Sequence, residues 1–441
     1  MVLMKTEISQ YCYDSKIGIE SYSTDFKGIG GRIKDRYEDF KVEELISSEI
    51  HSNISEKPTS DNKYPILRLV KEGVDTIHAM RQIRDRLGWN AHYLGLKDKQ
   101  AQTIQYISPK LLKKEIPRNI QVSSRISLDL FGYHRKRLTR KNLVGNRFTI
   151  RISNIETNFE QVKKSIAELK CFINDYRIPN FYGHQRFGSN KPNNHLIGRA
   201  IVKKQFKEAV TFILGHIEVD DKKTSLSKED IEDPGNYPSL IKKLCQKQDI
   251  EKLVLKSLID HPNNWITALR AVPITIRRFF VNAYQSYIFN RVMSIAVNRD
   301  LDLGEVDIGD IYGTVNEDGN ILDIRRAKSR VISYNTKKIL PIVQLVGYAF
   351  RAGIGRFDQI TQNILDEEGI SHKLFYNNQM SELSMEGGFR TPHLLVNDLK
   401  ILAYSRDKSF ISLQFALQKG SYATILLREL IKPSNPIAVG F

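Results

Sequence analysis

A single carboxylate, Asp98, lies between two lysines in the segment Gly95-Leu96-Lys97-Asp98-Lys99-Gln100. Neighbouring cations favour the charged form of a carboxylate, and an ionised carboxylate can act as a nucleophile or as a base. A lysine-flanked acid is therefore suited to chemistry on a polyanion. The same tripeptide is also typical of a solvated turn between two strands, so the motif alone leaves both interpretations open.

The segment from Tyr133 to Arg151 is dense in cations and contains no acid. Such density favours contact with a phosphate backbone, because each neutralised phosphate releases counterions. Leu143 and Phe148 indicate that the segment also has a structural role, so a solvated basic face is the alternative interpretation. The cations are Arg135, Lys136, Arg137, Arg140, Lys141, Arg147 and Arg151.

An aromatic segment interrupted by glycines follows, from Pro179 to Gly188. It carries Asn180, Tyr182, Gln185 and Arg186. An aromatic face contributes roughly 1–3 kcal/mol of stacking per base, and side-chain amides can read the Watson–Crick edge of an unstacked base. The composition therefore suits a flipped nucleotide, although a loop that packs into a core has a similar composition.

Two further segments contribute polar or charged groups. Gly420-Ser421-Tyr422-Ala423-Thr424 is predicted to begin the last helix, where outward-pointing amides and the helix dipole favour a negative group. Near the other end of the chain, Lys34 precedes a strand that contains Phe40 and could approach a carboxylate. Each of these two motifs has low specificity when taken alone.

The composition indicates a nucleic-acid partner. A chain of 441 residues is long enough for two domains, and 41% apolar content is ample for packed cores. The formal charge of +17 implies an acidic partner, for which nucleic acid is the leading candidate. The three cysteines lack metal-site spacing, and no signal peptide or bilayer-spanning run is evident, so we expect a cytoplasmic protein that does not bind membranes.

The elements expected to position Asp98 are short strands and one helix. Apolar patterns predict strands over 33–46 and 65–70, and a helix over 76–87 that is capped by Asp75 or Thr76 and ends at Gly88. Further strands are predicted over 92–96 and 103–107. Asp98 is therefore expected on the connection between the last two strands.

The rest of the chain mixes helices and strands, so we predict an α+β fold. The longest helical pattern covers 276–297, and the acidic and basic stretch 218–238 is typical of an exposed loop or linker. Additional helices are predicted over 159–172, 194–214 and from Ser421 to 431, and additional strands over 148–155, 411–417 and in several short pieces within 302–349.

Taken in order, these motifs resemble the TruD family of pseudouridine synthases, in an archaeal-type form. The resemblance covers nearly the whole chain. The segments that carry it are Lys34 with Glu38-Asp39-Phe40-Lys41-Val42-Glu43, Gly95 to Gln105, Tyr133 to Arg137 with Gly145-Asn146-Arg147-Phe148, Asn180 to Gly188, Gln285-Ser286-Tyr287-Ile288-Phe289-Asn290, and Gly420 to Leu430.

The resemblance implies isomerisation of a uridine in RNA to pseudouridine, for which position 13 of transfer RNA is the best-known site in the family. Asp98 matches the family's catalytic aspartate, and Lys34 supplies a nearby cation. Asn180 and Tyr182 align with residues that hold and stack the base, and Tyr422 aligns with a second aromatic. Both aromatic positions are commonly Phe in bacterial members. The implied reaction uses no metal, cofactor or ATP, and no obligate protein partner is expected.

The resemblance also implies a bipartite catalytic domain with a mixed or antiparallel sheet and flanking helices, interrupted by an inserted α/β domain. We place the first catalytic part at 1–205, the insertion at 206–395 and the C-terminal part at 396–441. The remaining substrate-binding residues are expected to be Phe40, Gln185, Arg186, Arg135, Lys136 and Arg137.

Two other functions are considered. A non-catalytic RNA-binding protein or RNA chaperone on the same scaffold would share the basic clefts and stacking aromatics. It would not need the carboxylate of Asp98. A metal-dependent nuclease or deaminase would need clustered ligands, and the ten histidines show no such spacing.

Overall fold

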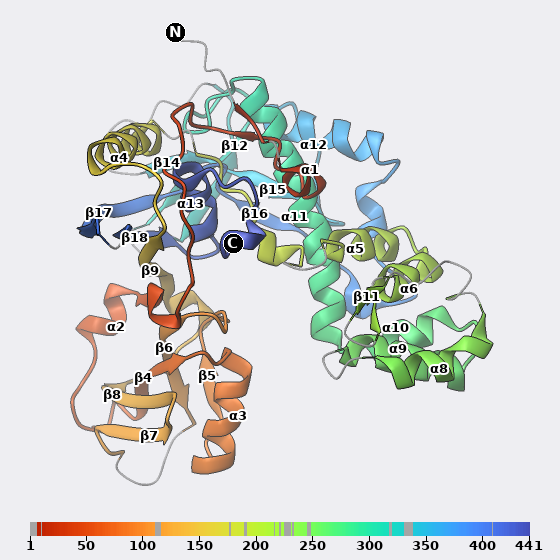
Figure 1. Ribbon diagram of the computed structural model, residues 1–441, viewed down its shortest axis with the longest axis horizontal. Helices are drawn as coiled ribbons and strands as arrows, with labels where there is room; N and C mark the ends of the chain where they lie inside the picture. Colours follow the sequence, from red (N-terminus) through yellow and green to blue (C-terminus); the bar gives the residue numbers. More distant parts are fainter. Residues whose placement is uncertain are drawn as a thin grey trace.

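The computed structural model describes residues 7–9, 11–110, 116–175, 178–188, 192–215, 217–219, 222–224, 231, 233–244, 248–316, 320–329, 338–407 and 409–441. One mixed sheet of nine strands forms the centre of the molecule (Figure 1). In spatial order its strands are β17 (Val396–Ser405), β18 (Phe410–Gln418), β9 (Leu143–Ser153), β3 (Phe40–Ile46), β6 (Gln102–Pro109), β4 (Tyr64–Glu72), β8 (Ile126–His134) and β7 (Asn119–Ser123), and β5 (Ala91–Tyr93) pairs with β6.

The sheet joins the two ends of the chain. β18 pairs antiparallel with β9 over nine positions, from Phe410 opposite Ser153 to Gln418 opposite Gly145. β9 in turn pairs antiparallel with β3, whereas β3 and β6 run parallel. Because side chains alternate between the faces of a strand, this register places Val42, Phe148 and Phe415 in one buried row.

Strands β4 to β8 and helix α3 (Thr76–Leu87) form a lobe with a small core of its own. The Asp75 carboxylate accepts a hydrogen bond from the His78 amide and caps α3, and Gly88 ends it with a φ of +69°. Both features confirm the predicted limits of this helix. The strands on either side of Asp98 are confirmed too, as β5 and β6.

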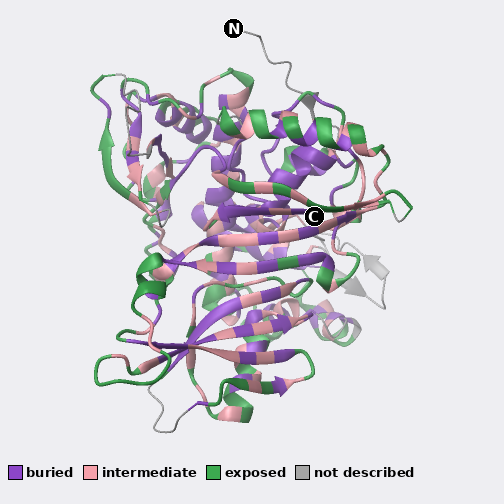
Figure 2. Ribbon diagram, turned by 90° about the vertical axis from the view of Figure 1, so that its left-hand side faces the viewer, coloured by how far each residue is buried: buried purple, intermediate pink, exposed green. Residues whose placement is uncertain are grey.

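Helices dominate the chain between β9 and β17. α4 (Phe159–Asn174) covers the sheet beside β17, and the long helix α11 (Ile274–Asn298), buried along much of its length, packs against α5 (Asn194–Val202) and α12 (Arg356–Glu367) (Figures 1 and 2). The other elements are α6 (Phe206–Leu214), β10 (Ile217–Val219), β11 (Lys222–Thr224), α8 (Tyr237–Lys243), α9 (Asp249–Asp260), α10 (Trp265–Ala271), β12 (Ile311–Val315), β13 (Ile321–Arg326), β14 (Lys338–Pro341), β15 (Val343–Leu345) and β16 (Gly388–Arg390).

All strands of the central sheet come from residues 40–153 and 396–418. An intervening segment that contributes no strand to the sheet is compatible with an insertion at 206–395. The exact limits of that insertion stay a prediction.

A buried ion cluster fastens the N-terminal segment to the last helix, α13 (Ala423–Ile431). Asp14, on the short helix α1 (Cys12–Lys16), accepts hydrogen bonds from Arg428 at 2.7 Å and 2.9 Å. His184 Nε2 lies 2.6 Å from the same carboxylate, and Asp14 and His184 are fully buried. The cluster therefore links three segments that are far apart in sequence.

The structure corrects the prediction of one long helix over 194–214. The chain instead forms α5 and α6, separated at residues 203–205. Lys204 adopts a left-handed conformation with a φ of +59°, and the amides of Lys204 and Gln205 donate to the carbonyls of Ile201 and Ala200. This pattern of bonds terminates a helix, although no glycine marks the position.

Three other boundaries differ from prediction. β3 begins only at Phe40, since the residues before it turn through a left-handed Lys34. The N-cap of α13 is Tyr422 and not Ser421. Within 218–238, residues 220–221, 225–230 and 232 lie outside the described residues, but the described part is not an exposed loop throughout. Residues 217–219 and 222–224 pair as the strands β10 and β11, Ile231 and Tyr237 are buried, and the Tyr237 hydroxyl donates to the Ile231 carbonyl at 2.6 Å.

The Asp14 cluster predicts a specific acid response. Burial alone raises the pKa of Asp14, but Arg428 and His184 oppose it and hold the pKa at about 2, below the ordinary value of 3.8. The stabilisation is therefore present above the unfolded-state value and is lost as the pH falls through the folded-state value. We expect the urea-unfolding free energy to decrease between about pH 4 and about pH 2, and this decrease to be smaller in Asp14→Asn.

At neutral pH, Asp14→Asn should lower the unfolding free energy by about 3–5 kcal/mol, because it leaves the buried Arg428 without the carboxylate at 2.7 Å and with only Glu429, at 3.7 Å, as an acidic partner. Asp25→Asn is the control, since Asp25 lies in the same N-terminal segment but is exposed. Equal stability of the two variants would contradict the role assigned to the cluster.

Candidate active site

Asp98 lines a cavity of about 310 Å³ at the junction of the two ends of the chain. Its walls come from β3, β9, the β5–β6 connection, the aromatic segment at Gln185 and the start of α13. The cavity thus brings together residues from all five of the motifs singled out in the sequence. Its lining residues are Phe40, Val42, Gly95, Leu96, Lys97, Asp98, Leu143, Asn146, Phe148, Gln185, Gly420, Ser421, Tyr422, Ala423 and Thr424.

Lys34 is the cation that faces Asp98. Its Nζ lies 3.9 Å from the Asp98 carboxylate and 4.7 Å from the centre of the Phe40 ring. The Lys34 side chain is 7% exposed and that of Asp98 is 57% exposed. Burial lowers the pKa of Lys34, and Asp98 partly opposes that shift.

The left-handed backbone of Lys34, with a φ of +62°, is unfavourable for a non-glycine residue and is typical of functional positions.

The flanking lysines serve other purposes than the sequence suggested. Lys97 Nζ donates to buried Glu44 at 2.8 Å, and Lys99 is exposed. The Asp98 side chain is more than half exposed. The cation that pairs with its carboxylate is Lys34, which is distant in sequence.

A buried network fixes the backbone on either side of Leu96. The Gln105 amide donates to the Gly95 carbonyl at 2.7 Å, and the Lys97 amide donates to the Thr76 hydroxyl at 3.0 Å. The Thr76 hydroxyl donates in turn to Gln105 Oε1 at 2.9 Å. The connection between β5 and β6 is consequently held in place from both sides.

Glu44 is the second anchor of this connection. One carboxylate oxygen accepts from Lys97 and the other from the Tyr106 amide, at 2.8 Å each. Lys71 is a buried neighbour, and its burial lowers its pKa to about 8. The negative charge of Glu44 therefore balances positive charge from two lysines, Lys97 and Lys71, in a buried region of the protein.

Tyr422 forms one wall of the cavity and Tyr182 lies behind it. Their ring centres are 6.0 Å apart at an angle of 64°, which leaves no room for a base between the two rings. Tyr182 also packs against the Arg390 guanidinium, 4.0 Å from its ring centre. Burial raises the pKa of Tyr422, although Arg186 and Arg390 oppose this shift. In this conformation only Tyr422 faces the cavity.

Asn180 is fully engaged inside the protein. Its Nδ2 donates to the Thr391 hydroxyl at 3.0 Å, and its Oδ1 accepts from Arg390 at 2.8 Å. Arg390 also donates to the carbonyls of Asn180 and Gly420. Asn180 and Arg390 therefore join the aromatic segment to the C-terminal segment, and Asn180 does not line the cavity.

Several polar groups of the cavity lining are buried and have no hydrogen-bond partner among the described residues. They come from β9, the aromatic segment and the start of α13. A buried polar group without a partner is costly and is often completed by a ligand. These atoms are Asn146 Oδ1, Gln185 Oε1, Ser421 Oγ and Thr424 Oγ1.

The remaining predicted residues lie around the cavity or apart from it. Arg186 donates to Ser286 on α11 at 3.1 Å and lies 5.4 Å from the centre of the Tyr182 ring. Arg135 and Lys136 are exposed, and Arg135 pairs with Glu49 at 3.0 Å. Arg137 is half-buried and donates to the Ser108 carbonyl at 3.3 Å. None of these four residues lines the cavity.

Sequence reasoning missed Glu44, Gln105 and Arg390, which hold the site together. Gln105 is the last residue of a motif that carries the resemblance, and Glu44 directly follows another, so their positions were a signal for them. Arg390 lies outside every motif that was singled out. Its role follows only from the approach of β16 to the aromatic segment.

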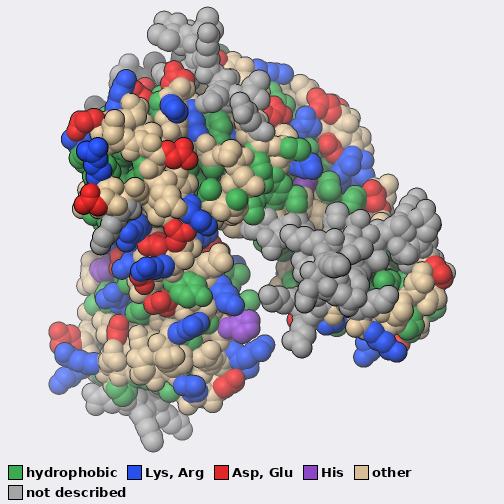
Figure 3. All heavy atoms as spheres, viewed as in Figure 1, with side chains coloured by type: hydrophobic (Ala, Val, Ile, Leu, Met, Phe, Trp, Pro, Cys, Tyr) green, Lys and Arg blue, Asp and Glu red, His purple; other side chains and the backbone are tan. Residues whose placement is uncertain are grey.

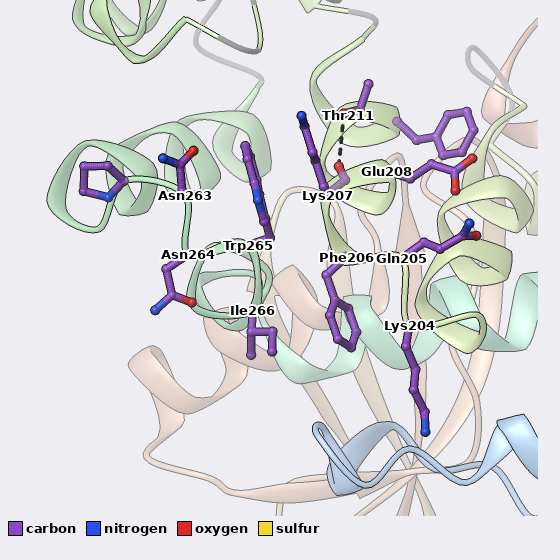
Figure 4. Close-up of a pocket in the computed structure, with 12 residues that line it drawn as sticks. Lys204, Gln205, Phe206, Lys207, Glu208, Thr211, Asn263, Asn264, Trp265 and Ile266 are labelled. Carbon is purple, nitrogen blue, oxygen red and sulfur yellow. Dashed lines mark hydrogen bonds between the residues drawn. The ribbon is translucent and has the colours of Figure 1, made fainter.

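A larger cavity of about 1040 Å³ lies between α6 and the segment 262–266, away from the predicted site residues. In Figure 4, Phe206, Trp265 and Ile266 form its apolar side, and Thr211 donates to the Lys207 carbonyl at 3.0 Å. This cavity contains no carboxylate paired with a buried lysine. Within the described ranges, no group of three His, Cys, Asp or Glu side chains is placed to hold a metal, and no helix is long and apolar enough to cross a membrane.

Comparison with known proteins gives one consistent result. The family model described as tRNA pseudouridine synthase D (TruD) matches residues 16–430. A Methanosarcina mazei protein named "Probable tRNA pseudouridine synthase D" is 31% identical, with 96% of this chain and 98% of the relative covered. A relative of the same name from Pyrobaculum islandicum is 30% identical, with 97% and 98% covered.

The fold is also that of a solved structure. A crystal structure of a chain assigned to TruD from Methanosarcina mazei superposes with a TM-score of 0.75 at 28% identity, covering 96% of this chain and 98% of that chain. The architecture is thus an α+β fold with a mixed sheet and flanking helices, as predicted. The chain belongs to the TruD family of tRNA pseudouridine synthases.

The anchoring network predicts a large effect of Glu44→Gln. This variant keeps the hydrogen bond from Tyr106 but removes the charge that balances Lys97, so we expect a loss of about 3–5 kcal/mol in unfolding free energy. Amide hydrogen exchange of residues 95–99 should become faster, because one anchor of the connection is lost.

Glu43→Gln is the matched control. Glu43 is the next residue on β3 but lies on the other face, where it pairs with Arg147 at 3.1 Å and is 32% exposed. Its loss should cost less than about 1 kcal/mol, as for other solvated pairs. Similar costs for the two variants would show that the buried network does not hold the loop.

Proposed function

We propose that this chain isomerises a uridine of transfer RNA to pseudouridine, with Asp98 as the catalytic carboxylate. The observation that carries the proposal is the cavity that Asp98 and Tyr422 line together, with the Lys34 ammonium 3.9 Å from the Asp98 carboxylate, because these three residues come from distant parts of the chain. Family membership and relatives named for this activity support it.

The reaction exchanges one bond for another. The bond from C1′ of the ribose to N1 of uracil breaks, the ring turns, and a bond from C1′ to C5 forms. The proton leaves C5 and N1 gains one, so no external reagent is consumed. An exposed carboxylate at the mouth of the cavity has three possible targets: C1′, C6 of the ring, or the proton on C2′.

Lys34 pairs with Asp98 through a buried side chain. Its ammonium lies 4.7 Å from the centre of the Phe40 ring and 3.9 Å from the Asp98 carboxylate. Part of the cost of burying Lys34 is offset by Asp98. Lys34 thus acts on the carboxylate, and no contact between Lys34 and the RNA is required.

The uracil must leave its stack to reach the cavity, at a cost of a few kcal/mol. The Tyr422 ring offers a replacement stacking face, and the unpartnered groups of Gln185, Ser421 and Thr424 offer hydrogen bonds to the base. Tyr182 and Asn180 support this wall from behind. The segment 179–188 and the start of α13 would thus bind the extruded base together.

Position 13 of transfer RNA is the expected target within the family. Figure 3 shows an open gap between the lobe of β4–β8 and the lobe that contains α8–α10, with Lys and Arg side chains on the surface of both lobes. The described Lys and Arg side chains on the two lobes favour binding of a polyanion such as RNA. We place the activity in the cytoplasm, with transfer RNA as partner and without an obligate protein partner.

Asp98→Asn should abolish pseudouridine formation and leave RNA affinity within about threefold, because it removes the reacting group and no phosphate contact. Pseudouridine is measured after reaction with a carbodiimide, and affinity by filter binding. Asp85→Asn, an exposed carboxylate on α3, is the control and should retain full activity. Wild-type protein that binds transfer RNA but forms no pseudouridine would instead favour a non-catalytic RNA-binding protein.

Replacement of Arg135, Lys136 and Arg137 by Gln tests the RNA-binding surface. If these cations contact phosphates, the plot of log affinity against log salt should become shallower by about one unit for each lost contact. Arg135 is already paired with Glu49, so the exposed Lys136 should contribute most. An unchanged slope would place all three away from the RNA, whatever the activity of the variant.

A further inference from the structure

Two large apolar side chains of the β4–β8 lobe are exposed beside the cavity. Leu96 is 64% exposed and Ile77 is 57% exposed. Among the described residues before Leu253, they are the only large apolar side chains that are exposed to solvent. Single exposed apolar residues are common on protein surfaces. The position of these two is unusual, however, because they flank the same hydrogen bond, from the Lys97 amide to the Thr76 hydroxyl.

Leu96 stands at the cavity itself. Leu96 and Asp98 both line the cavity, and only Lys97 lies between them in the sequence. Asp98 is also more than half exposed, so the carboxylate and the apolar side chain are presented to the same ligand. A nucleotide bound at Asp98 would therefore lie close to Leu96.

The backbone that carries Leu96 is rigid. The Gly95 carbonyl accepts a hydrogen bond from Gln105, and the Lys97 amide donates one to the Thr76 hydroxyl. The Lys97 side chain donates to Glu44. The network therefore holds the backbone on both sides of Leu96, whose side chain is 64% exposed there.

We propose that Leu96, with Ile77 beside it, is an apolar wedge that enters the RNA stack and occupies the space left by the extruded uridine. The inference rests on the proposed function and extends it, because it names the residue that keeps the uridine out of the stack. Apolar side chains that enter base steps unstack them at a cost of a few kcal/mol, and the wedge offsets the stacking that is lost.

The charge of the chain favours RNA as the partner of this apolar surface. With a net charge of +17, the protein attracts polyanions, and the exposed Lys99 follows Asp98 directly in the sequence. A protein partner would be expected to cover more than two apolar side chains. A base stack presents an apolar face of the required size at this point.

The test places 2-aminopurine, whose fluorescence rises on unstacking, next to the target uridine of a transfer RNA. All proteins carry Asp98→Asn, so binding is observed without chemistry. Leu96→Ala should at least halve the fluorescence increase at saturating protein, whereas Leu96→Met, which keeps an apolar side chain of similar volume, should retain it. Leu402→Ala is the matched control, because Leu402 is 47% exposed on β17 and lies outside the cavity lining.

The same substitution is then tested in the active protein. Leu96→Ala should lower the single-turnover rate by about tenfold or more on folded transfer RNA, and by less than about threefold when abasic nucleotides flank the target uridine. Such RNA has little stacking to replace. Equal losses on the two RNAs, or an undiminished fluorescence rise, would overturn the wedge. A normal fluorescence rise without any pseudouridine from the wild-type protein would overturn the proposed function and not the wedge.

Discussion

The antiparallel pairing of β18 with β9 is the interaction on which the site depends. The nine-position register brings residues 410–418 beside residues 145–153 and places the start of α13 next to β3 and the Asp98 connection. Without it, Tyr422 and Thr424 would have no fixed relation to Asp98. Gly145 allows the close approach, since a Cβ at this position would lie 2.2 Å from the Leu417 carbonyl oxygen.

Buried polar contacts then fix the pieces that the sheet brings together. Arg428 ties the last helix to Asp14, Arg390 ties the aromatic segment to Gly420, and Asn290 on α11 bonds both main-chain groups of Tyr182. Each contact joins segments that are far apart in sequence. Buried polar groups are costly when unpaired, so these contacts favour one arrangement over others of similar packing.

Much of the fold could be predicted because its signals are local. The Asp75 cap, the Gly88 stop and the apolar periodicity of α3 and α11 all act within a few residues, and these elements were predicted correctly. The break at Lys204 and the late start of β3 were missed. Both depend on left-handed lysines, which no local propensity favours and which only surrounding contacts can stabilise.

By itself, the sequence determined the family and its implied chemistry, because ordered motifs over nearly the whole chain are specific even where each motif is weak. It also singled out Asp98 and Lys34. The tertiary structure alone decided which groups face one another: Lys97 turns to Glu44, Lys34 faces Asp98, and Tyr182 stands behind Tyr422. The reason is physical, since burial and pairing depend on distances that the packing of strands and helices sets, and residue order does not fix those distances.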